Sequence, residues 1–271
     1  MRRFTAGLLT ALASAVAVAC PVSAAPAGEA LAAHRAVYAL SLGDLRSSSA
    51  VTDAAGRFEF AWTDVCDGWA VTQRFRLALL YEDDLSISFG WSLSSWESKD
   101  GRQYRFFIRR FDGAGELEQV RGEATLADNG SGRAVYYEPE PREVALPPGT
   151  LFPTAHTRHV LAETARGAAP VWTQVFDGSG EGGPFGVSAI LSRALPPEAP
   201  ARIDSPLLTG IASWRVSLAY YGIEAGELEP EQEQDLRLFA NGVVDEMRLD
   251  YGDFVLDASL AELESLPRPD C

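Results

Sequence analysis

Hydrophobic and polar residues alternate along most of this chain, and that alternation predicts β-strands. The clearest example is segment 86–98, in which residues such as Phe89 and Trp91 are separated by serine or glycine. A period of two places these aromatic side chains on the same face of a strand. Asp100-Gly101 then leads into a second alternating segment at 103–111, and this arrangement is typical of a tight β-hairpin.

The same pattern predicts further strands on both sides of this hairpin, separated by turns that contain Gly, Asn, Asp or Pro. One helix is expected at 155–165, ending at Gly167, and segment 259–266 is interpreted as a short helix or an extended strap. The remaining strands are expected at 33–42, 56–62, 69–77, 116–126, 133–138, 142–146, 171–176, 185–192, 213–221, 234–240, 243–250 and 253–258.

So many strands in one continuous meander, interrupted by a helix, favour a single large antiparallel sheet. A flat open sheet of that width would expose long edges, so we expect the sheet to curl. The predicted fold is therefore mainly β: one large antiparallel curled sheet, a β-spiral or an open barrel, wrapped around one or two helices. A two-sheet sandwich is less favoured.

The start of the chain has the composition of a secretory signal peptide. Two arginines precede an apolar stretch at 6–20, and residues 22–24 supply the small side chains that signal peptidase needs. We therefore expect residues 1–24 to be removed, which leaves 25–271 as a single domain. No later stretch is long and apolar enough to predict a stable membrane span.

Cys20 leaves a second processing route open. Residues 17–19 loosely resemble the box at which bacterial lipoproteins are cleaved and lipidated. That box lacks its usual leucine, and Pro21 follows the cysteine. Cleavage after Ala24 is therefore favoured over lipid anchoring at Cys20, and the predicted location is the periplasm.

The charge of the chain limits the classes of partner that it could bind. The formal net charge is −15, and loss of the two arginines of the signal peptide leaves about −17. A surface this acidic argues against binding to nucleic acid and against electrostatic attachment to anionic lipid head groups.

The mature chain retains one pair of cysteines, Cys66 and Cys271. Such a pair could act as a redox switch or form a permanent structural disulfide. The absence of a C-x-x-C motif favours the structural disulfide. Closing so long a loop contributes roughly 4 to 5 kcal/mol on the loop-entropy argument. We interpret the bond as a clasp that ties the last segment to the turn after the second strand and protects the end of a spiralling sheet.

The residues that could support catalysis or metal binding are few. His156 and His159 lie on one face of the predicted helix and could bind a metal or act as a base, but no third ligand accompanies them. Helix packing is the favoured role. The glycine-rich segment 178–186 is interpreted as a mobile hairpin tip, and no G-x-S-x-G motif is present. We therefore expect a protein that is not an enzyme and that has no metal or cofactor.

Aromatic residues on the predicted strands and at the helix start are the stronger indication of function. Most are expected in the core, yet a curled sheet wider than an eight-stranded barrel can leave an apolar hollow. Such a hollow would admit an acyl chain or a lipidated peptide. The candidate lining residues are Phe58, Phe60, Trp62, Phe89, Trp91, Trp96 and Phe152.

Three motifs in order give the chain a family resemblance: HRAVY at 34–38, CDGW at 66–69 and LFPTAH at 151–156. With the terminal cysteine, they resemble the EipB-type cell-envelope integrity proteins of the Gram-negative periplasm, over about 33–271. The resemblance implies a spiral-like β-sheet, a disulfide between Cys66 and Cys271, and a role in keeping the envelope intact under stress. It also implies a shape similar to periplasmic lipoprotein carriers.

Two functional hypotheses follow from these observations. The first is a non-enzymatic periplasmic protein that supports envelope integrity by binding a lipid, lipoprotein or hydrophobic peptide in a β-cavity. The alternative is a scaffold that binds another envelope protein through its outer surface or a sheet edge. A hydrolase acting on envelope polymers is the least favoured, because no catalytic constellation is visible.

Overall fold

The structure is a computed structural model of the 271-residue chain. It describes residues 31–45, 49–83, 85–167, 170–180, 183–196, 198–222 and 229–271. The expected signal peptide at 1–24 and the expected alternative lipidation site at Cys20 lie outside the described residues.

Strands account for most of the described chain, with one helix among them. The first half of the chain forms β1 (His34–Leu45), β2 (Val51–Asp64), β3 (Gly68–Tyr81), β4 (Ser86–Ser98), β5 (Gln103–Asp112), β6 (Gly115–Leu126), β7 (Gly132–Glu138) and β8 (Arg142–Leu146). The second half forms β9 (Thr150–Leu151), α1 (Pro153–Arg166), β10 (Val171–Val175), β11 (Phe185–Ala194), β12 (Ser213–Tyr221), β13 (Gln232–Phe239), β14 (Val244–Asp250) and β15 (Phe254–Ser265).

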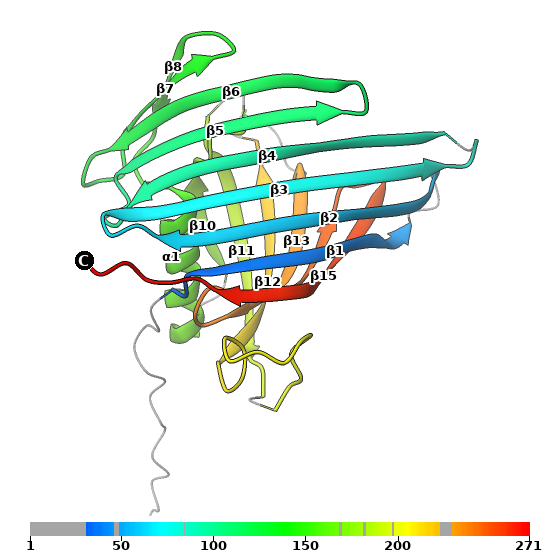
Figure 1. The fold of residues 1–271 in the computed structure, drawn as a ribbon. Helices are drawn as coiled ribbons and strands as arrows, with labels where there is room; N and C mark the ends of the chain where they lie inside the picture. The colour runs from blue at the N-terminus through cyan, green and yellow to red at the C-terminus, as the bar shows by residue number, and fades with distance from the viewer. Residues whose placement is uncertain are drawn as a thin grey trace, which may run out of the picture.

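The fifteen strands of the described residues belong to one sheet, with the order β8-β7-β6-β5-β4-β3-β2-β1-β15-β14-β13-β12-β11-β10-β9. The first strand, β1, pairs with the last strand, β15, in the middle of this order. The sheet curls so that β1–β6 form a front layer and β10–β14 cross behind it, with α1 at one side (Figure 1). The prediction of one large curled sheet around a helix is confirmed.

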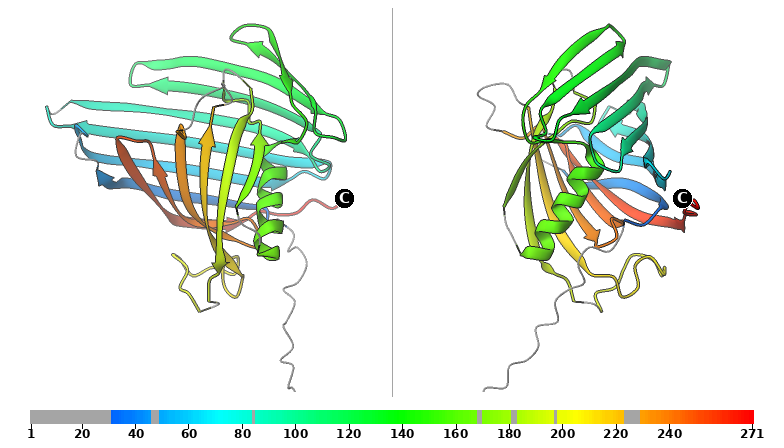
Figure 2. Two further views of the ribbon diagram at one scale, coloured as in Figure 1. Left: turned by 180° about the vertical axis from the view of Figure 1, so that it is seen from behind. Right: turned by 90° about the vertical axis from the view of Figure 1, so that its left-hand side faces the viewer.

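The two layers differ in strand length, and this mismatch shapes one end of the molecule. Strands β2 and β3 have 14 residues each, whereas β13 and β14 have 8 and 7. The β3–β4 hairpin therefore projects beyond the back layer, at the end of the front strands remote from the C-terminus (Figures 1 and 2).

Two details differ from the sequence-based expectation. The pairing of β9 with β10 is parallel, so the sheet is not antiparallel throughout. Segment 259–265 is the second half of β15 and not a helix or a strap. Leu260 and Leu263 are spaced like residues of a helix, but a register shift between them places them opposite Tyr38 and Ala36 of β1. A bulge of this kind hides the period of two.

The inner side of the curled sheet holds the hydrophobic core. The largest cluster joins β1–β3 to β13–β15 and to the loop that carries Leu208. A second cluster covers β5–β7 and includes Phe152 and Phe176. A third packs Val160 of α1 against β10–β13. The helix thus closes the side of the sheet where the two layers diverge (Figure 2).

Cys66 and Cys271 are joined in a disulfide with a Cα–Cα distance of 5.9 Å. The tail leaves β15 beside the start of β1, where the Leu266 amide donates to the Ala33 carbonyl over 2.9 Å, and then reaches the β2–β3 turn. The ends of the sheet are β8 and β9. Our expectation that the bond guards an end of the sheet is therefore wrong: it fastens the central strands β15, β1 and β2 to one another.

We expect Cys271→Ser to lower the thermal unfolding temperature of the oxidised protein. The bond closes a loop with a sequence separation of 205 residues, and losing it removes at most roughly 4 to 5 kcal/mol. Thermal unfolding with and without reductant measures the effect. Reductant should have no further effect on the variant, and a variant as stable as the oxidised wild type would contradict the clasp role.

Candidate functional site

A row of aromatic side chains crosses the inner face of the front layer. Tyr38 of β1 lies opposite Phe58 of β2, Phe58 lies opposite Phe75 of β3, and Phe75 lies opposite Trp91 of β4. Their ring centroids are 5.7, 6.4 and 5.7 Å apart in that order, and Phe75 and Trp91 are stacked at 8°. Cross-strand pairing thus builds one continuous aromatic surface.

A second line of rings runs along β2. Phe60 lies 6.5 Å from Phe58 and 6.0 Å from Trp62, measured between ring centroids. The imidazole of His34 lies 5.5 Å from Phe60 and is bonded through Nδ1 to the Ala32 carbonyl at 2.8 Å. Burial lowers the pKa of His34, so it contributes to this surface as a neutral ring.

The exposure of these residues shows which of them a ligand could touch. Tyr38, Trp62 and Phe75 are buried. Phe58, Phe60 and Trp91 pack against the same core but keep part of their surface accessible. The middle of the inner face is therefore only partly covered by the opposite layer, and three aromatic rings remain available there.

The other three expected lining residues take different positions. Phe89 is on the same face of β4 as Trp91, nearer the projecting hairpin, and is 36% exposed. Trp96 is on the opposite face of β4, where Arg105 lies over its ring at 5.2 Å. Phe152 is fully buried and stacks on Tyr104 at 5.1 Å in the separate cluster over β5–β7. Trp96 and Phe152 thus lie apart from the aromatic row.

Glu97 connects the inner face of β4 to the start of α1. Its carboxylate accepts hydrogen bonds from the backbone amides of Thr154 and Ala155, at 2.7 and 2.8 Å. These are free amides of the first helical turn, and Phe152 at the N-cap provides no side-chain cap. Burial raises the pKa of Glu97 to about 7, although the two amide bonds favour the charged form.

The two helix histidines differ in their burial. His156 is buried, and burial lowers its pKa to about 4. His159 is half-buried. The described residues contain no group of three or more His, Cys, Asp and Glu side chains that could hold a metal ion.

Residues 178–180, at the start of the glycine-rich segment, are packed inward, whereas residues 181–182 of the expected mobile tip lie outside the described residues. Gly178 lies so close to the Phe106 ring that a Cβ would come within 2.5 Å of it. The carbonyls of Ser179 and Gly180 accept bonds from Arg110 and Tyr136, at 3.0 and 3.2 Å. These contacts cover part of the inner face of β5–β7.

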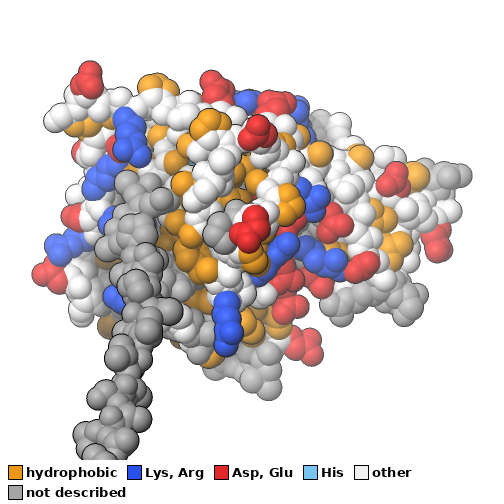
Figure 3. Space-filling model, turned by 90° about the horizontal axis from the view of Figure 1, so that it is seen from below, with side chains coloured by type: hydrophobic (Ala, Val, Ile, Leu, Met, Phe, Trp, Pro, Cys, Tyr) orange, Lys and Arg blue, Asp and Glu red, His pale blue; other side chains and the backbone are white. Residues whose placement is uncertain are grey.

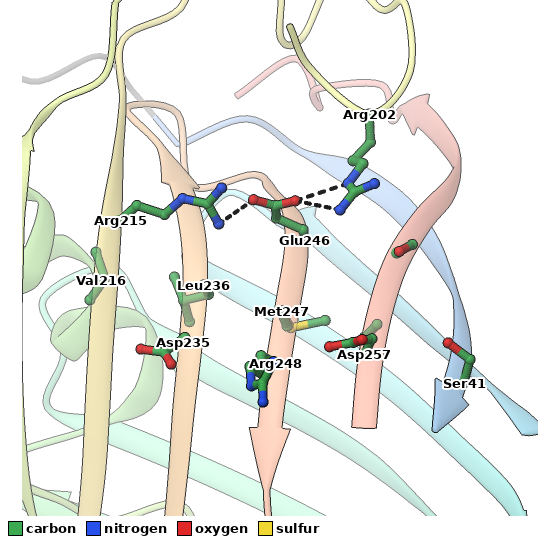
Figure 4. A pocket seen from close by; sticks show the side chains of 12 residues that line it. Ser41, Arg202, Arg215, Val216, Asp235, Leu236, Glu246, Met247, Arg248 and Asp257 are labelled. Atoms are coloured by element: carbon green, nitrogen blue, oxygen red, sulfur yellow. Dashed lines mark hydrogen bonds and ion pairs between the residues drawn. The ribbon is translucent and has the colours of Figure 1, made fainter. Parts of the chain in front are cut away.

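A charged groove of about 660 Å³ lies on the back layer near β12–β15 (Figure 4). Glu246 lies between Arg202 and Arg215 and pairs with both, at 2.8 Å for Arg202. Arg248 pairs with Asp44. Seen from below, acidic, basic and hydrophobic side chains are interspersed (Figure 3). Because these charges already pair with one another, the groove is a weaker candidate than the aromatic row.

Sequence reasoning missed Tyr38, Phe75 and Glu97. The two rings lie in segments that were predicted as strands, but only the cross-strand register shows that they complete the row. Glu97 had a local signal: it follows Phe89, Trp91, Leu93 and Ser95 at every second position of β4. A carboxylate on a largely apolar face indicates a specific partner, here the helix N-terminus.

The fold and the site together define a class: a curled, nearly closed β-sheet protein with an accessible aromatic inner face and a disulfide at its central strands. The EipB-like family model matches residues 25–267. The chain therefore belongs to the EipB-like family, which is associated with cell-envelope integrity.

Two known proteins extend this comparison. The chain is 26% identical over 244 residues to cell envelope integrity protein EipB of Brucella abortus, covering 86% of this chain and 84% of that protein. It also resembles the crystal structure of a β-barrel-like protein of a domain of unknown function from Brucella abortus, with a TM-score of 0.78 and 23% identity. That match covers 88% of this chain and 99% of the other, and it supports the fold alone. Among the described residues, no helix has the length and apolar character to cross a membrane.

We predict that Glu97 makes stability depend on pH. The folded pKa of about 7 lies above the ordinary value of 4.5. The contribution of Glu97 is therefore full below pH 4.5 and is lost as the pH rises through 7. The stability advantage of the wild type over Glu97→Gln should shrink between about pH 5 and about pH 8.

Urea unfolding of both proteins across this pH range tests the prediction. Glu143→Gln on β8, where the side chain is 58% exposed, controls for removing one carboxylate. A wild-type advantage over Glu97→Gln that stays constant with pH would show that Glu97 does not cause the dependence.

Proposed function

We propose that this protein is a non-enzymatic periplasmic factor that supports envelope integrity by holding an apolar ligand against the inner face of its sheet. The ligand class is an acyl chain, the lipidated end of a lipoprotein, or a hydrophobic peptide. The observation that carries the proposal is the aromatic row with the partly exposed rings of Phe58, Phe60 and Trp91.

The physical argument rests on apolar burial. Removing apolar surface from water contributes about 25 cal/mol per Å², or about 0.8 kcal/mol for each buried methylene of a chain. Aromatic rings offer wide, rigid surfaces that lose little freedom when a ligand covers them. Phe89 extends the same face toward the projecting hairpin and gives a ligand a continuous apolar approach.

The proposed location and the absence of catalysis have separate support. The signal-like residues 1–24 and the Cys66–Cys271 disulfide fit an exported protein in an oxidising compartment. The two buried histidines beside the inner face, His34 and His156, have lowered pKa values and suit packing roles better than proton transfer.

One observation favours the scaffold alternative. Strand β8 is at one end of the sheet order and pairs only with β7 among the described strands. A partner strand could add to its other edge. This alternative needs no ligand on the aromatic row, so a test of the row separates the two hypotheses.

Quenching of tryptophan fluorescence by a brominated fatty acid tests the proposed function. A bromine atom quenches only nearby indoles, so the wild type should be quenched and Trp91→Phe should lose the largest share of that effect. Trp172→Phe is the matched control, because Trp172 is 61% exposed on β10, away from the aromatic row.

The outcome that contradicts the proposal is equally clear. If the fatty acid causes no quenching, or if Trp91→Phe and Trp172→Phe are quenched to the same extent, the ligand does not lie on the aromatic row. Phenylalanine keeps an aromatic ring at position 91, so both variants are expected to fold.

A further inference from the structure

The tip of the β3–β4 hairpin carries an uncovered apolar strip. Leu85, Ile87 and Phe89 are 50%, 41% and 36% exposed. They occur at alternate positions: Ile87 and Phe89 are on the face of β4 that carries Trp91, and Leu85 directly precedes this strand. The hairpin projects beyond the back layer, which explains why that layer does not cover them (Figure 2).

This strip is a continuation of the core and not a set of isolated surface residues. Ile87 lies opposite Leu79, and Phe89 lies opposite Leu77, in the register of β3 and β4. Both leucines are only 3% exposed. Contiguous exposed apolar surface joined to a core is typical of a surface that binds a partner.

The charges in the turns next to the strip are acidic, and the arginine nearest to it on the same face, Arg110 opposite Trp91, is paired with Glu118. Glu82 and Asp83 are exposed in the β3–β4 turn. Asp112 lies opposite Phe89 on β5, and Glu116 is exposed at the start of β6. In the described segments 80–83, 85–89 and 111–117, no lysine or arginine is present. The strip is thus an apolar surface with negative charge at its margins.

We propose that this strip, Leu85, Ile87 and Phe89 with its acidic margin, is a docking site for a basic amphipathic segment of a partner protein. The apolar side chains of that segment would cover the strip, and its lysines or arginines would face Glu82, Asp83 and Asp112. Complementary charge guides association and excludes wrong partners. The same charge repels an anionic membrane surface, which therefore fits the strip less well.

The test uses the full oxidised protein and a fluorescein-labelled peptide of alternating leucine and lysine, with binding followed by fluorescence anisotropy. The wild type should bind this peptide, and the affinity should fall as salt is added. A matched peptide with glutamate in place of lysine should not bind. Ile87→Ser and the double variant Glu82→Lys/Asp83→Lys should each weaken binding at least about tenfold.

Control variants away from the strip should bind like the wild type. Ile190→Ser removes a side chain that is 60% exposed on β11, and Glu143→Lys reverses a charge on the exposed edge strand β8. Trp91→Phe should also retain peptide binding, and Ile87→Ser should retain quenching by the brominated fatty acid. Failure of this proposal is thereby distinguished from failure of the proposed function.

Three results would overturn the proposal. The first is equal binding of the lysine and glutamate peptides, which would remove the charge argument. The second is unchanged binding by the charge-reversed variant or by Ile87→Ser. The third is binding to phosphatidylglycerol vesicles that Ile87→Ser abolishes, which would assign the strip to a membrane surface.

Discussion

The pairing of β1 with β15 is the interaction on which the rest of the structure depends. It joins the first and the last strand of the chain in the middle of the sheet and makes two meanders into one continuous surface. Without it, β1 and β15 would each present an unpaired edge. The Cys66–Cys271 bond and the Leu266 amide secure the same three central strands. The disulfide and the hydrogen bonds thus hold together the same junction of β15, β1 and β2, called the central seam below.

The two faces of this sheet have different roles because strand alternation separates them strictly. Within β4, Trp91 contributes to the aromatic row, whereas Trp96 is on the other face under Arg105. The inner face is apolar and holds the core, and the outer face of β12–β15 carries paired charges that keep it compatible with water. The unequal lengths of the front and back strands then leave part of the inner face uncovered. The family to which the chain belongs is associated with cell-envelope integrity.

Local patterns in the sequence predict the elements well and their partners poorly. The boundaries expected for 86–98, 142–146 and 213–221 are those of β4, β8 and β12. Each has clear turn residues or strong alternation. The pairing of β1 with β15 cannot be predicted from the sequence of either strand, because the register between distant strands depends on the whole fold. The bulge near Leu260 interrupts the alternation in β15, so the second half of this strand is not recognised from the sequence. Tyr38 and Phe75 are identified as part of the site only from the residues opposite them on neighbouring strands.

The central seam also sets an order of assembly. During synthesis the chain emerges from its amino terminus, and the hairpins from β1 to β8 involve neighbouring segments that can pair early. The edge of β1 that pairs with β15 stays unpaired until almost the whole remaining chain has been synthesised. Contacts so distant in sequence form slowly, and an exposed strand edge is a site of aggregation in the meantime. A protein built around such a seam depends on protection of that edge while the chain is still incomplete.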